Sequence, residues 1–274
     1  MVPVIGPGVQ WRIQLELIIH QLRILLLSDI HSNLEALQAC LAAAPAHDAV
    51  VNLGDIVGYG ASPNEVAQRT RELGGTYVRG NHDKVVAGIE SAETFNPIAA
   101  VAALWNRDQL TTENLDWVRG LPKGPVLVET LPGVQLVHGA ADDEDRYVVT
   151  FEEAAQQLAN INQTLTFFGH THVQGGFLLR NELTSVEDLV PEYDSVGKSE
   201  TWDLKLELGA RYLINPGSIG QPRDGDWRAA FAVFDSEKQV VTFCRVPYDL
   251  RSAQEKVMAA NLPARLATRL AAGR

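Results

Sequence analysis

Short apolar runs that end abruptly in acidic or histidine side chains constrain the fold of this chain more than any other feature. The first run, Arg23 to Leu27, has the length of a strand, and Asp29 and His31 follow it closely. A second run, Asp48 to Leu53, stops in the same way at Gly54-Asp55. In α/β proteins, ligands gather just past the carboxyl ends of buried strands, because the strand is rigid and the following loop is open. The pattern therefore predicts an active site at strand ends.

Helices alternate with these strands. Residues Asn33 to Ala43 carry leucines at helical spacing behind an asparagine, and Pro63 opens a second helix that runs to about Leu73. A third strand, Thr76 to Arg79, ends in Gly80-Asn81-His82-Asp83. No repeat, low-complexity tract or linker interrupts the sequence, so we expect a single domain over residues 23–274, with residues 1–22 as an extension ahead of it.

The second half of the chain has a more antiparallel pattern. Pro125 to Glu129 and Val134 to His138 flank a Leu-Pro-Gly turn, which predicts a β-hairpin. Residues 91–120 are helical and partly apolar, and form a lid, a flank of the site or plain core. Residues 182–208 are polar and without periodicity, which predicts an inserted hairpin or loop.

The other elements of this half follow from local signals. Thr150 and Glu153 form a capping box for a helix that reaches about Ile161, and the Ala- and Arg-rich residues from Leu250 onward favour helix. Further strands are expected at Leu165 to Phe168, Tyr212 to Ile214, Ala229 to Phe234 and Gln239 to Val246.

Charge and cysteine content exclude several classes of protein. The net charge of -11 argues against a protein that coats nucleic acid, since such proteins need a basic surface. Cys40 and Cys244 lie far apart, which indicates neither a disulfide framework nor a thiolate zinc site and suits a reducing cytoplasm. Polar residues interrupt the apolar stretch between Ile13 and Leu27, so it is neither a signal peptide nor a membrane span. We expect a cytoplasmic protein with no stable nucleic-acid or membrane partner.

Most of the seven histidines collect where strands are expected to end. Together with two aspartates and an asparagine they form one set: Asp29, His31, Asp55, Asn81, His82, His138, His170 and His172. Imidazole nitrogens mixed with carboxylate and amide oxygens suit Mn, Zn or Fe, whereas Mg and Ca prefer all-oxygen sites. One carboxylate can hold two ions about 3.5–4 Å apart, and Asp55 is the candidate for that bridge.

The order of these motifs resembles that of the calcineurin-like metallophosphoesterase superfamily. The motifs are Asp29-Ile30-His31, Gly54-Asp55, Gly80-Asn81-His82-Asp83, Val137-His138-Gly139 and Gly169-His170-Thr171-His172, and the likeness extends from about residue 23 to residue 220. Ser28 to Asn33 and Asn215-Pro216-Gly217-Ser218 resemble the bacterial and archaeal phosphodiesterase-type members and those labelled diadenosine tetraphosphatase-like. We expect a four-layer α/β/β/α sandwich of two mixed sheets with flanking helices.

The resemblance implies a role for each residue of the set. Asp29, His31 and His172 would bind a first divalent ion, Asn81, His138 and His170 a second, and Asp55 both. His82 would protonate the leaving group or stabilise the transition state, with Asp83 orienting its ring. A metal-bound hydroxide would then attack phosphorus in line.

Departures from the family pattern bear on the substrate. Protein phosphatases and symmetrical dinucleotide tetraphosphatases carry a phosphate-binding arginine shortly after the Gly-Asp motif, whereas this chain has Ile56-Val57-Gly58-Tyr59 there. Loss of that bidentate contact favours diesters over doubly charged monoesters. Arg223 and Arg79 are the remaining candidates for contact with a second phosphate, and an ordinary ion pair at a strand end explains Arg79 equally well. Tyr59 stands four residues after Asp55 and not three, which disfavours a tyrosine-ligated ferric site.

We therefore expect a dinuclear-metal phosphoesterase acting on a small phosphodiester or nucleotide. The alternatives are a dinucleotide tetraphosphatase, a Ser/Thr protein phosphatase and, more distantly, a non-catalytic scaffold of the same fold. The residue types leave the metal (Mn, Zn or Fe), the natural substrate and the oligomeric state open.

Overall fold

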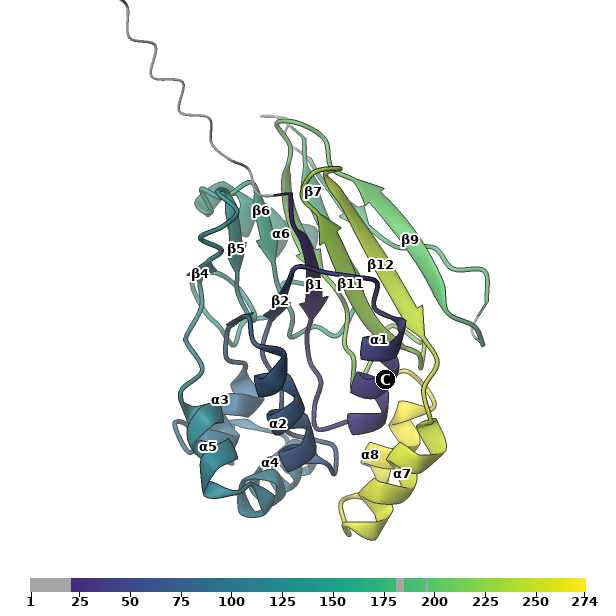
Figure 1. The fold of residues 1–274 in the computed structure, drawn as a ribbon. Coiled ribbons are helices and arrows are strands. Elements are labelled where there is room, and N and C mark those ends of the chain that lie inside the picture. Colours follow the sequence, from purple (N-terminus) through teal and green to yellow (C-terminus); the bar gives the residue numbers. More distant parts are fainter. Residues whose placement is uncertain (1–20, 181–184, 196) are drawn as a thin grey trace, which may run out of the picture.

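Two six-stranded mixed sheets pack face to face, and helices cover their outer faces (Figure 1). The structure is a computed structural model that describes residues 21–180, 185–195 and 197–274. The extension predicted for residues 1–22 lies outside these ranges, apart from its last two residues. The arrangement confirms the predicted sandwich of two mixed sheets with flanking helices.

The first sheet has the order β3-β2-β1-β11-β12-β9. Strands β1, β2 and β3 run parallel to one another, and the other neighbours are antiparallel. In chain order its strands are β1 Arg23–Leu27, β2 Ala49–Asn52, β3 Thr76–Tyr77, β9 Glu200–Lys205, β11 Ala229–Asp235 and β12 Val240–Val246.

The second sheet has the order β4-β5-β6-β10-β7-β8. Strands β5, β6 and β10 are parallel, and the pairs β4–β5, β10–β7 and β7–β8 are antiparallel. Its strands are β4 Val126–Leu127, β5 Val134–Leu136, β6 Leu165–Phe167, β7 Gly175–Leu179, β8 Val186–Leu189 and β10 Arg211–Asn215.

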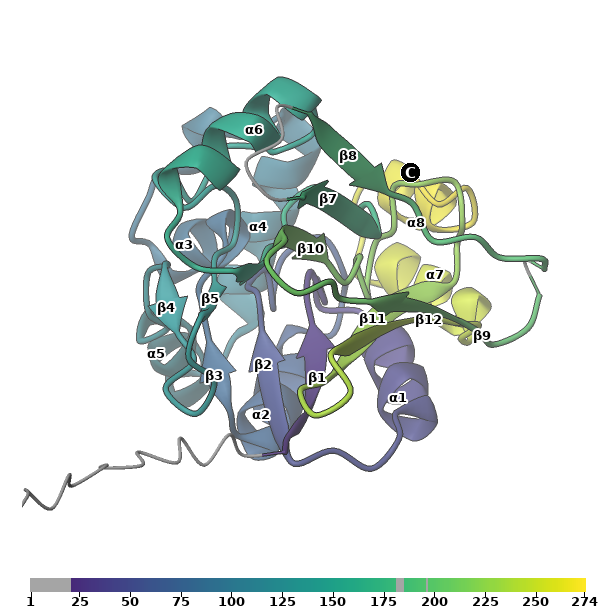
Figure 2. The ribbon, with the colours of Figure 1, turned by 90° about the horizontal axis from the view of Figure 1, so that it is seen from above.

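The helices form the outer layers. Figure 2 shows α6 on the outer side of one sheet and α1 on the outer side of the other. The bounds are α1 Leu34–Ala43, α2 Pro63–Leu73, α3 Asn81–Ala87, α4 Pro97–Gln109, α5 Thr112–Arg119, α6 Phe151–Asn160, α7 Leu250–Ala259 and α8 Ala264–Leu270, with a 3₁₀ turn η1 at Ala92–Thr94. Within the described ranges, no helix is long and apolar enough to cross a lipid bilayer.

Strand β1 shows why the core has two main layers. Leu25 and Leu27 are fully buried and point toward the helices, whereas Ile24 and Leu26 pack between the sheets with Phe167 of β6. A strand turns alternate side chains to opposite faces, so a continuous apolar run is what a strand buried on both faces requires.

The polar stretch over residues 182–208, for which we predict an inserted hairpin or loop, contains two strands among its described residues. Its strands β8 and β9 lie at the edges of different sheets, β8 beside β7 and β9 beside β12. Strand β9 alternates half-buried and exposed side chains, as an edge strand with one solvated face does. The predicted β4–β5 hairpin and the capping box at Thr150 and Glu153 are both present.

Parallel registers bring the ends of the site-forming strands together. Leu27 of β1 pairs with Asn52 of β2, and Leu136 of β5 pairs with Phe167 of β6. The loops that follow these residues therefore start at the same level. Helices α2 to α5 gather beyond the tips of β1 and β2 (Figure 1).

Candidate metal centre

Backbone hydrogen bonds hold the loops after the strands against one another. The Asp29 amide donates to the Gly54 carbonyl at 3.0 Å, and the His31 amide donates to the Asp55 carbonyl at 3.0 Å. Where β5 and β6 of the second sheet end, the Gly169 amide donates to the His138 carbonyl at 2.8 Å. The motifs that the sequence places at strand ends are thus joined into one surface.

Two groups of possible metal ligands form on this surface and share Asp55. One consists of Asp29, His31, Asp55 and His172, the other of Asp55, His138 and His170, and every member is buried. Asp55 Oδ2 lies 3.5 Å from His31 Nε2 in the first group and 3.5 Å from His138 Nε2 in the second. Asn81 joins the second group, with its Oδ1 3.2 Å from His138 Nε2. A single carboxylate oxygen therefore stands between the two groups.

One ligand atom of the first group lacks the partner that buried polar atoms normally have. Asp29 Oδ1 is buried and accepts no hydrogen bond, and it lies 3.2 Å from His172 Nε2. His172 Nε2 in turn lies 3.1 Å from His31 Nε2. Nitrogen and oxygen atoms that converge in this way fit a divalent cation of intermediate softness, so the residues present suit the metal that the motifs imply.

Main-chain carbonyls set the proton on each imidazole. His138 Nδ1 lies 2.6 Å from the Leu53 carbonyl, His172 Nδ1 2.6 Å from the Gln221 carbonyl, and His31 Nδ1 3.3 Å from the Val57 carbonyl. A carbonyl can only accept, so each Nδ1 carries a hydrogen, and in the neutral form of each ring Nε2 presents a lone pair.

His170 uses its ring nitrogens in the opposite sense. Its Nε2 lies 3.0 Å from the Asp145 carbonyl, which leaves Nδ1 as the free lone pair. The lone pairs of His31 and His172 face each other across 3.1 Å. That contact is repulsive between neutral rings and would become favourable if both nitrogens bound one cation.

Strained backbone is concentrated at the same positions. Nine non-glycine residues in the described chain have a positive φ, and five of them are predicted ligands. These are Asp29 (51°), His31 (49°), Asp55 (54°), His170 (66°) and His172 (60°). The left-handed conformation costs roughly 1–2 kcal/mol per non-glycine residue and persists where the surroundings impose it, most often at functional sites.

Two glycines permit this close approach. A Cβ on Gly80 would lie 2.0 Å from Asp55 Oδ1, and one on Gly54, whose φ is 94°, would lie 2.5 Å from the Gly80 amide nitrogen. Both positions therefore require glycine, which explains the glycine ahead of each of these two ligand motifs.

Burial and mutual charge set the ionisation of the site. Burial lowers the pKa of His31 well below its ordinary value and brings that of His170 to about 3, so both rings are neutral and able to bind a metal. Although burial opposes the charge, the Asp55 carboxylate raises the pKa of His138 to about 10. Burial also opposes the charge of Asp55, but the positive charge of His138 outweighs it and holds the pKa of that carboxyl well below its usual range.

His82 stands beside the two groups, in the wall of an open cleft. The cleft has a volume of about 340 Å³ and is lined by Asp55, Asn81, His82, His170, His172 and Arg223 together with aromatic and polar side chains. The His82 ring packs against the rings of Tyr59, Phe95 and His31 at centroid distances of 4.3, 4.5 and 4.8 Å. Burial lowers the pKa of His82 to about 4.

Asp83 does not make the predicted contact with the His82 ring. Its carboxylate accepts four backbone hydrogen bonds instead, from the amides of Asp55, Ile56, Val57 and Gly80 at 2.8–3.2 Å. His82 Nδ1 is buried without a partner. Asp83 therefore acts through the main chain, because it fixes the loop that carries Asp55 against the start of α3.

The two candidate arginines have different positions. Arg223 lines the cleft, and its Nη2 lies 3.3 Å from the Tyr59 hydroxyl. Arg79 is not part of the cleft wall, and it forms a bidentate ion pair with Glu144 at 2.9 and 3.2 Å. Arg79 therefore forms an ordinary ion pair, and the predicted contact of Arg79 with substrate is not supported.

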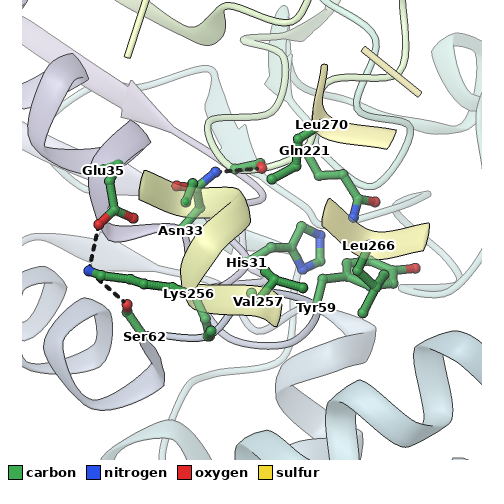
Figure 3. A pocket seen from close by; sticks show the side chains of 15 residues that line it. His31, Asn33, Glu35, Tyr59, Ser62, Gln221, Lys256, Val257, Leu266 and Leu270 are labelled. Carbon is green, nitrogen blue, oxygen red and sulfur yellow. Dashed lines mark hydrogen bonds and ion pairs between the residues drawn. The ribbon is translucent and has the colours of Figure 1, made fainter. Parts of the chain in front are cut away.

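A smaller cavity lies behind His31, under the C-terminal helices (Figure 3). Its volume of about 20 Å³ holds about one water molecule, which is too little for a substrate. Lys256 of α7 forms an ion pair with Glu35 of α1 and lies 3.5 Å from Ser62 Oγ on its other side. This cavity is therefore a small gap in the packing, and the contacts of Lys256 hold the C-terminal helices beside the site.

Asn106 is a site residue that the sequence did not reveal. It lies on α4, within the segment predicted as lid or flank, and is completely buried. Its Oδ1 accepts from Ser32 Oγ at 2.6 Å and from the Gly58 amide at 3.0 Å, and its Nδ2 donates to the Gly60 carbonyl at 3.0 Å. A lone asparagine in a helix gives no sequence signal for such a role.

Replacing Asn106 by alanine is expected to destabilise the protein by about 3 kcal/mol, because several buried polar groups lose their partner at once. For a chain of this size that corresponds to a fall in Tm of roughly 6–12 °C, measured by calorimetry. Asn160→Ala, at the exposed end of α6, is the matched control and should change stability by less than about 0.5 kcal/mol. Equal Tm values for the two variants would contradict this role of Asn106.

Comparison with known proteins gives consistent matches. Residues 22–239 match the calcineurin-like phosphoesterase superfamily domain. An uncharacterized protein of Methanocaldococcus jannaschii is 36% identical over 260 residues, which cover 92% of this chain and 98% of that protein. The crystal structure of a metallophosphoesterase from Sphaerobacter thermophilus is 39% identical, with a TM-score of 0.79 over 92% of this chain and 99% of its own.

A more distant structure agrees in fold. A hypothetical protein from Pyrococcus horikoshii has a TM-score of 0.71 at 18% identity, over 92% of this chain and 98% of its own. The family match spans most of the chain and includes every motif at the strand ends. This chain therefore belongs to the calcineurin-like phosphoesterase superfamily.

Proposed function

We propose that this protein is a dinuclear-metal phosphoesterase that hydrolyses a small phosphodiester or nucleotide. The observation that carries the proposal is the position of Asp55 Oδ2, which is 3.5 Å from a histidine nitrogen of each ligand group. That is the arrangement a bridging carboxylate needs. Asp29, His31 and His172 would hold one ion and Asn81, His138 and His170 the other, with Mn, Zn or Fe as the metals these donors suit.

The chain's own residues have separate tasks in this proposal. Divalent cations held by these residues would supply a nucleophile near neutral pH and would neutralise charge on the phosphoryl group. His82 donates a proton or a hydrogen bond to the leaving oxygen from the cleft wall, where its ring is packed among aromatic side chains. Asp83 keeps the Asp55 loop in place, and Arg223 contributes the positive charge of the cleft.

The preference for a diester rests on the charges around the cleft. The segment from Ile56 to Tyr59 has no arginine, and Arg223 shares the cleft wall with the acidic Glu90 and Asp145. A doubly charged monoester is stabilised less by this cleft wall than by a wall with an arginine that makes a bidentate contact beside the metals. We further propose that the protein works in the cytoplasm, since Cys40 and Cys244 are buried and unpaired.

Metal analysis combined with a substrate panel tests the proposal. The purified protein is expected to contain about two divalent ions per chain and to hydrolyse bis-p-nitrophenyl phosphate faster than p-nitrophenyl phosphate, with activity lost in EDTA and restored by Mn²⁺ or Zn²⁺. The diester should also exceed diadenosine tetraphosphate and a phosphoserine peptide. A preference for diadenosine tetraphosphate would indicate a dinucleotide tetraphosphatase, and a preference for the phosphoserine peptide would indicate a protein phosphatase. Metal binding without any turnover would favour a scaffold.

A further inference from the structure

Two arginine side chains lie over the ring of Tyr59, a residue that lines the cleft. The guanidinium carbon of Arg223 lies 5.9 Å from the ring centroid, and that of Arg269, on α8, lies 5.7 Å from it. Arg223 Nη2 reaches two neutral acceptors, the Tyr59 hydroxyl and Gln221 Oε1, each at 3.3 Å. Arg223 Nε is buried without a hydrogen-bond partner.

Neither guanidinium has an acidic side chain to neutralise it. Arg269 Nε donates to the main-chain oxygen of Arg274, and in the described part of the chain no Asp or Glu lies within ion-pair distance of Arg223 or Arg269. Other buried arginines are paired: Arg228 binds both Asp226 and Glu200, at 2.6 Å each. Arg223 is partly buried and has no such partner, and a desolvated cation without an acidic side chain within ion-pair distance is costly unless an anion joins it.

The position of this arginine pair relates it to the candidate metal centre. The Tyr59 ring lies 4.7 Å from the His31 ring and 4.3 Å from the His82 ring, so the same residue contacts the ligand group and the arginines. The Arg223 amide donates to the His172 carbonyl at 3.1 Å. Figure 3 shows Tyr59 between His31 and Leu266 of α8. An anion held by the arginines would therefore lie beside the reacting phosphoryl group.

We propose that Arg223 and Arg269 form a subsite for a second phosphoryl group of the substrate. The proposal rests on the proposed function, since the first phosphoryl group is the one bound at the metals. Arginine suits this task because its planar fork of N–H donors matches phosphate oxygens. Burial and the charge of Arg223 lower the pKa of Arg269, as expected for a cation without an acidic side chain beside it.

Helix α8 brings a residue that the family match does not cover. That match ends at residue 239, whereas α8 spans Ala264–Leu270. Leu266 and Ala267 pack with Tyr59 in one apolar cluster, which fixes the position of Arg269 over the ring. The C-terminal helices are thus expected to select substrates with a further phosphate, attached through an anhydride or as a separate ester.

Binding of inorganic pyrophosphate in the presence of EDTA tests the subsite without catalysis. Isothermal titration should show binding to the wild-type protein and to Arg251→Gln, a control that removes one exposed positive charge from α7. Affinity should fall about 10-fold to 100-fold in Arg269→Gln, the loss expected for one charge-assisted contact, and recover in part in Arg269→Lys. Equal affinity of Arg269→Gln and wild type, or no binding to wild type at millimolar pyrophosphate, would overturn the proposal.

Turnover of matched substrates tests the same subsite in the metal-loaded enzyme. Thymidine 5′-(p-nitrophenyl phosphate) is compared with its 3′-phosphorylated form and with the p-nitrophenyl ester of thymidine 5′-diphosphate. In wild type, kcat/KM should be higher for at least one of the two forms with a second phosphoryl group, and the form preferred tells an ester-linked phosphate from an anhydride-linked one. In Arg269→Gln this preference should fall about tenfold, and a preference unchanged from wild type would contradict the subsite.

The two experiments separate the subsite from the proposed function. If the loaded enzyme cleaves none of the three esters, the proposed function is wrong for them, and the pyrophosphate titration still decides whether Arg269 binds an anion. If the arginines serve only as packing on Tyr59, Arg269→Gln lowers Tm and leaves pyrophosphate affinity unchanged, which rejects the subsite.

Discussion

The Asp55→Asn protein should fold, lose most of its bound metal and lose turnover by at least about 1000-fold. Asparagine keeps the shape of the side chain and replaces an anionic oxygen by a neutral group, so neither ligand group retains the shared charge. Metal-assisted charge stabilisation contributes several kcal/mol to phosphoryl transfer, and about 4 kcal/mol corresponds to three orders of magnitude in rate. Metal content by plasma emission and kcat/KM on bis-p-nitrophenyl phosphate measure the two effects.

The control for this substitution is Asp108→Asn on the exposed side of α4, where the same chemical change should leave both quantities unaltered. Two retained ions and a rate within tenfold of wild type in Asp55→Asn would show that Asp55 is not the bridge. Loss of metal with retained circular dichroism is the expected combination.

The His82→Ala protein should keep both ions and lose turnover by about 100-fold to 10,000-fold on a diester with an alkoxide leaving group. That range is typical for removal of a general acid. His82 Nδ1 has no hydrogen-bond partner, and the His82 amide donates to Asp55 Oδ1, so alanine preserves the contact with the ligand loop.

The leaving group distinguishes the two roles proposed for His82. A p-nitrophenolate departs without protonation, so an acid role predicts a much smaller loss on bis-p-nitrophenyl phosphate than on the alkoxide substrate. Equal losses on both substrates would indicate a hydrogen bond to the phosphoryl oxygens instead. His47→Ala, at an exposed histidine that bonds the Pro45 carbonyl, is the control and should match wild type.

The strand ends were the part of this protein that sequence could predict. A buried strand reads as a short apolar run, and in β1 a polar motif interrupts that run where the strand stops. Parallel pairing of β1 with β2 and of β5 with β6 then brings such motifs together without further information. Each ligand group, however, combines residues that follow strands of both sheets, so it also depends on how the two sheets pack against each other.

Edge strands were harder to predict because their partners are remote. Strand β9 pairs with β12, whose sequence lies about 40 residues later, and its exposed face is polar. Strand β7, which lies inside its sheet next to the edge strand β8, begins with Gly175 and Gly176. These glycines lower any strand signal and are needed because a Cβ on Gly175 would lie 2.1 Å from the Leu189 carbonyl oxygen. These strands form because of pairing with segments that are distant in the sequence, which local patterns do not reveal.

Side chains that act through the main chain or from distant helices also escaped prediction. The family resemblance implies that Asp83 orients the His82 ring, whereas in the structure its carboxylate accepts from the amides of the Asp55 loop. Arg269 comes from a helix that no motif connects to the site, and Tyr59 was considered only as a possible ligand. Such contacts depend on packing between elements far apart in sequence.

The carbonyl partners of the histidines limit how this site can change. Orienting acceptors are often side chains, which a point substitution can remove, but His31, His138, His170 and His172 all rely on main-chain oxygens. No single replacement deletes a peptide carbonyl, so the direction of each imidazole lone pair is protected against mutation. Efforts to alter metal preference should therefore begin with Asp29, Asp55 or Asn81, whose donor chemistry is open to exchange.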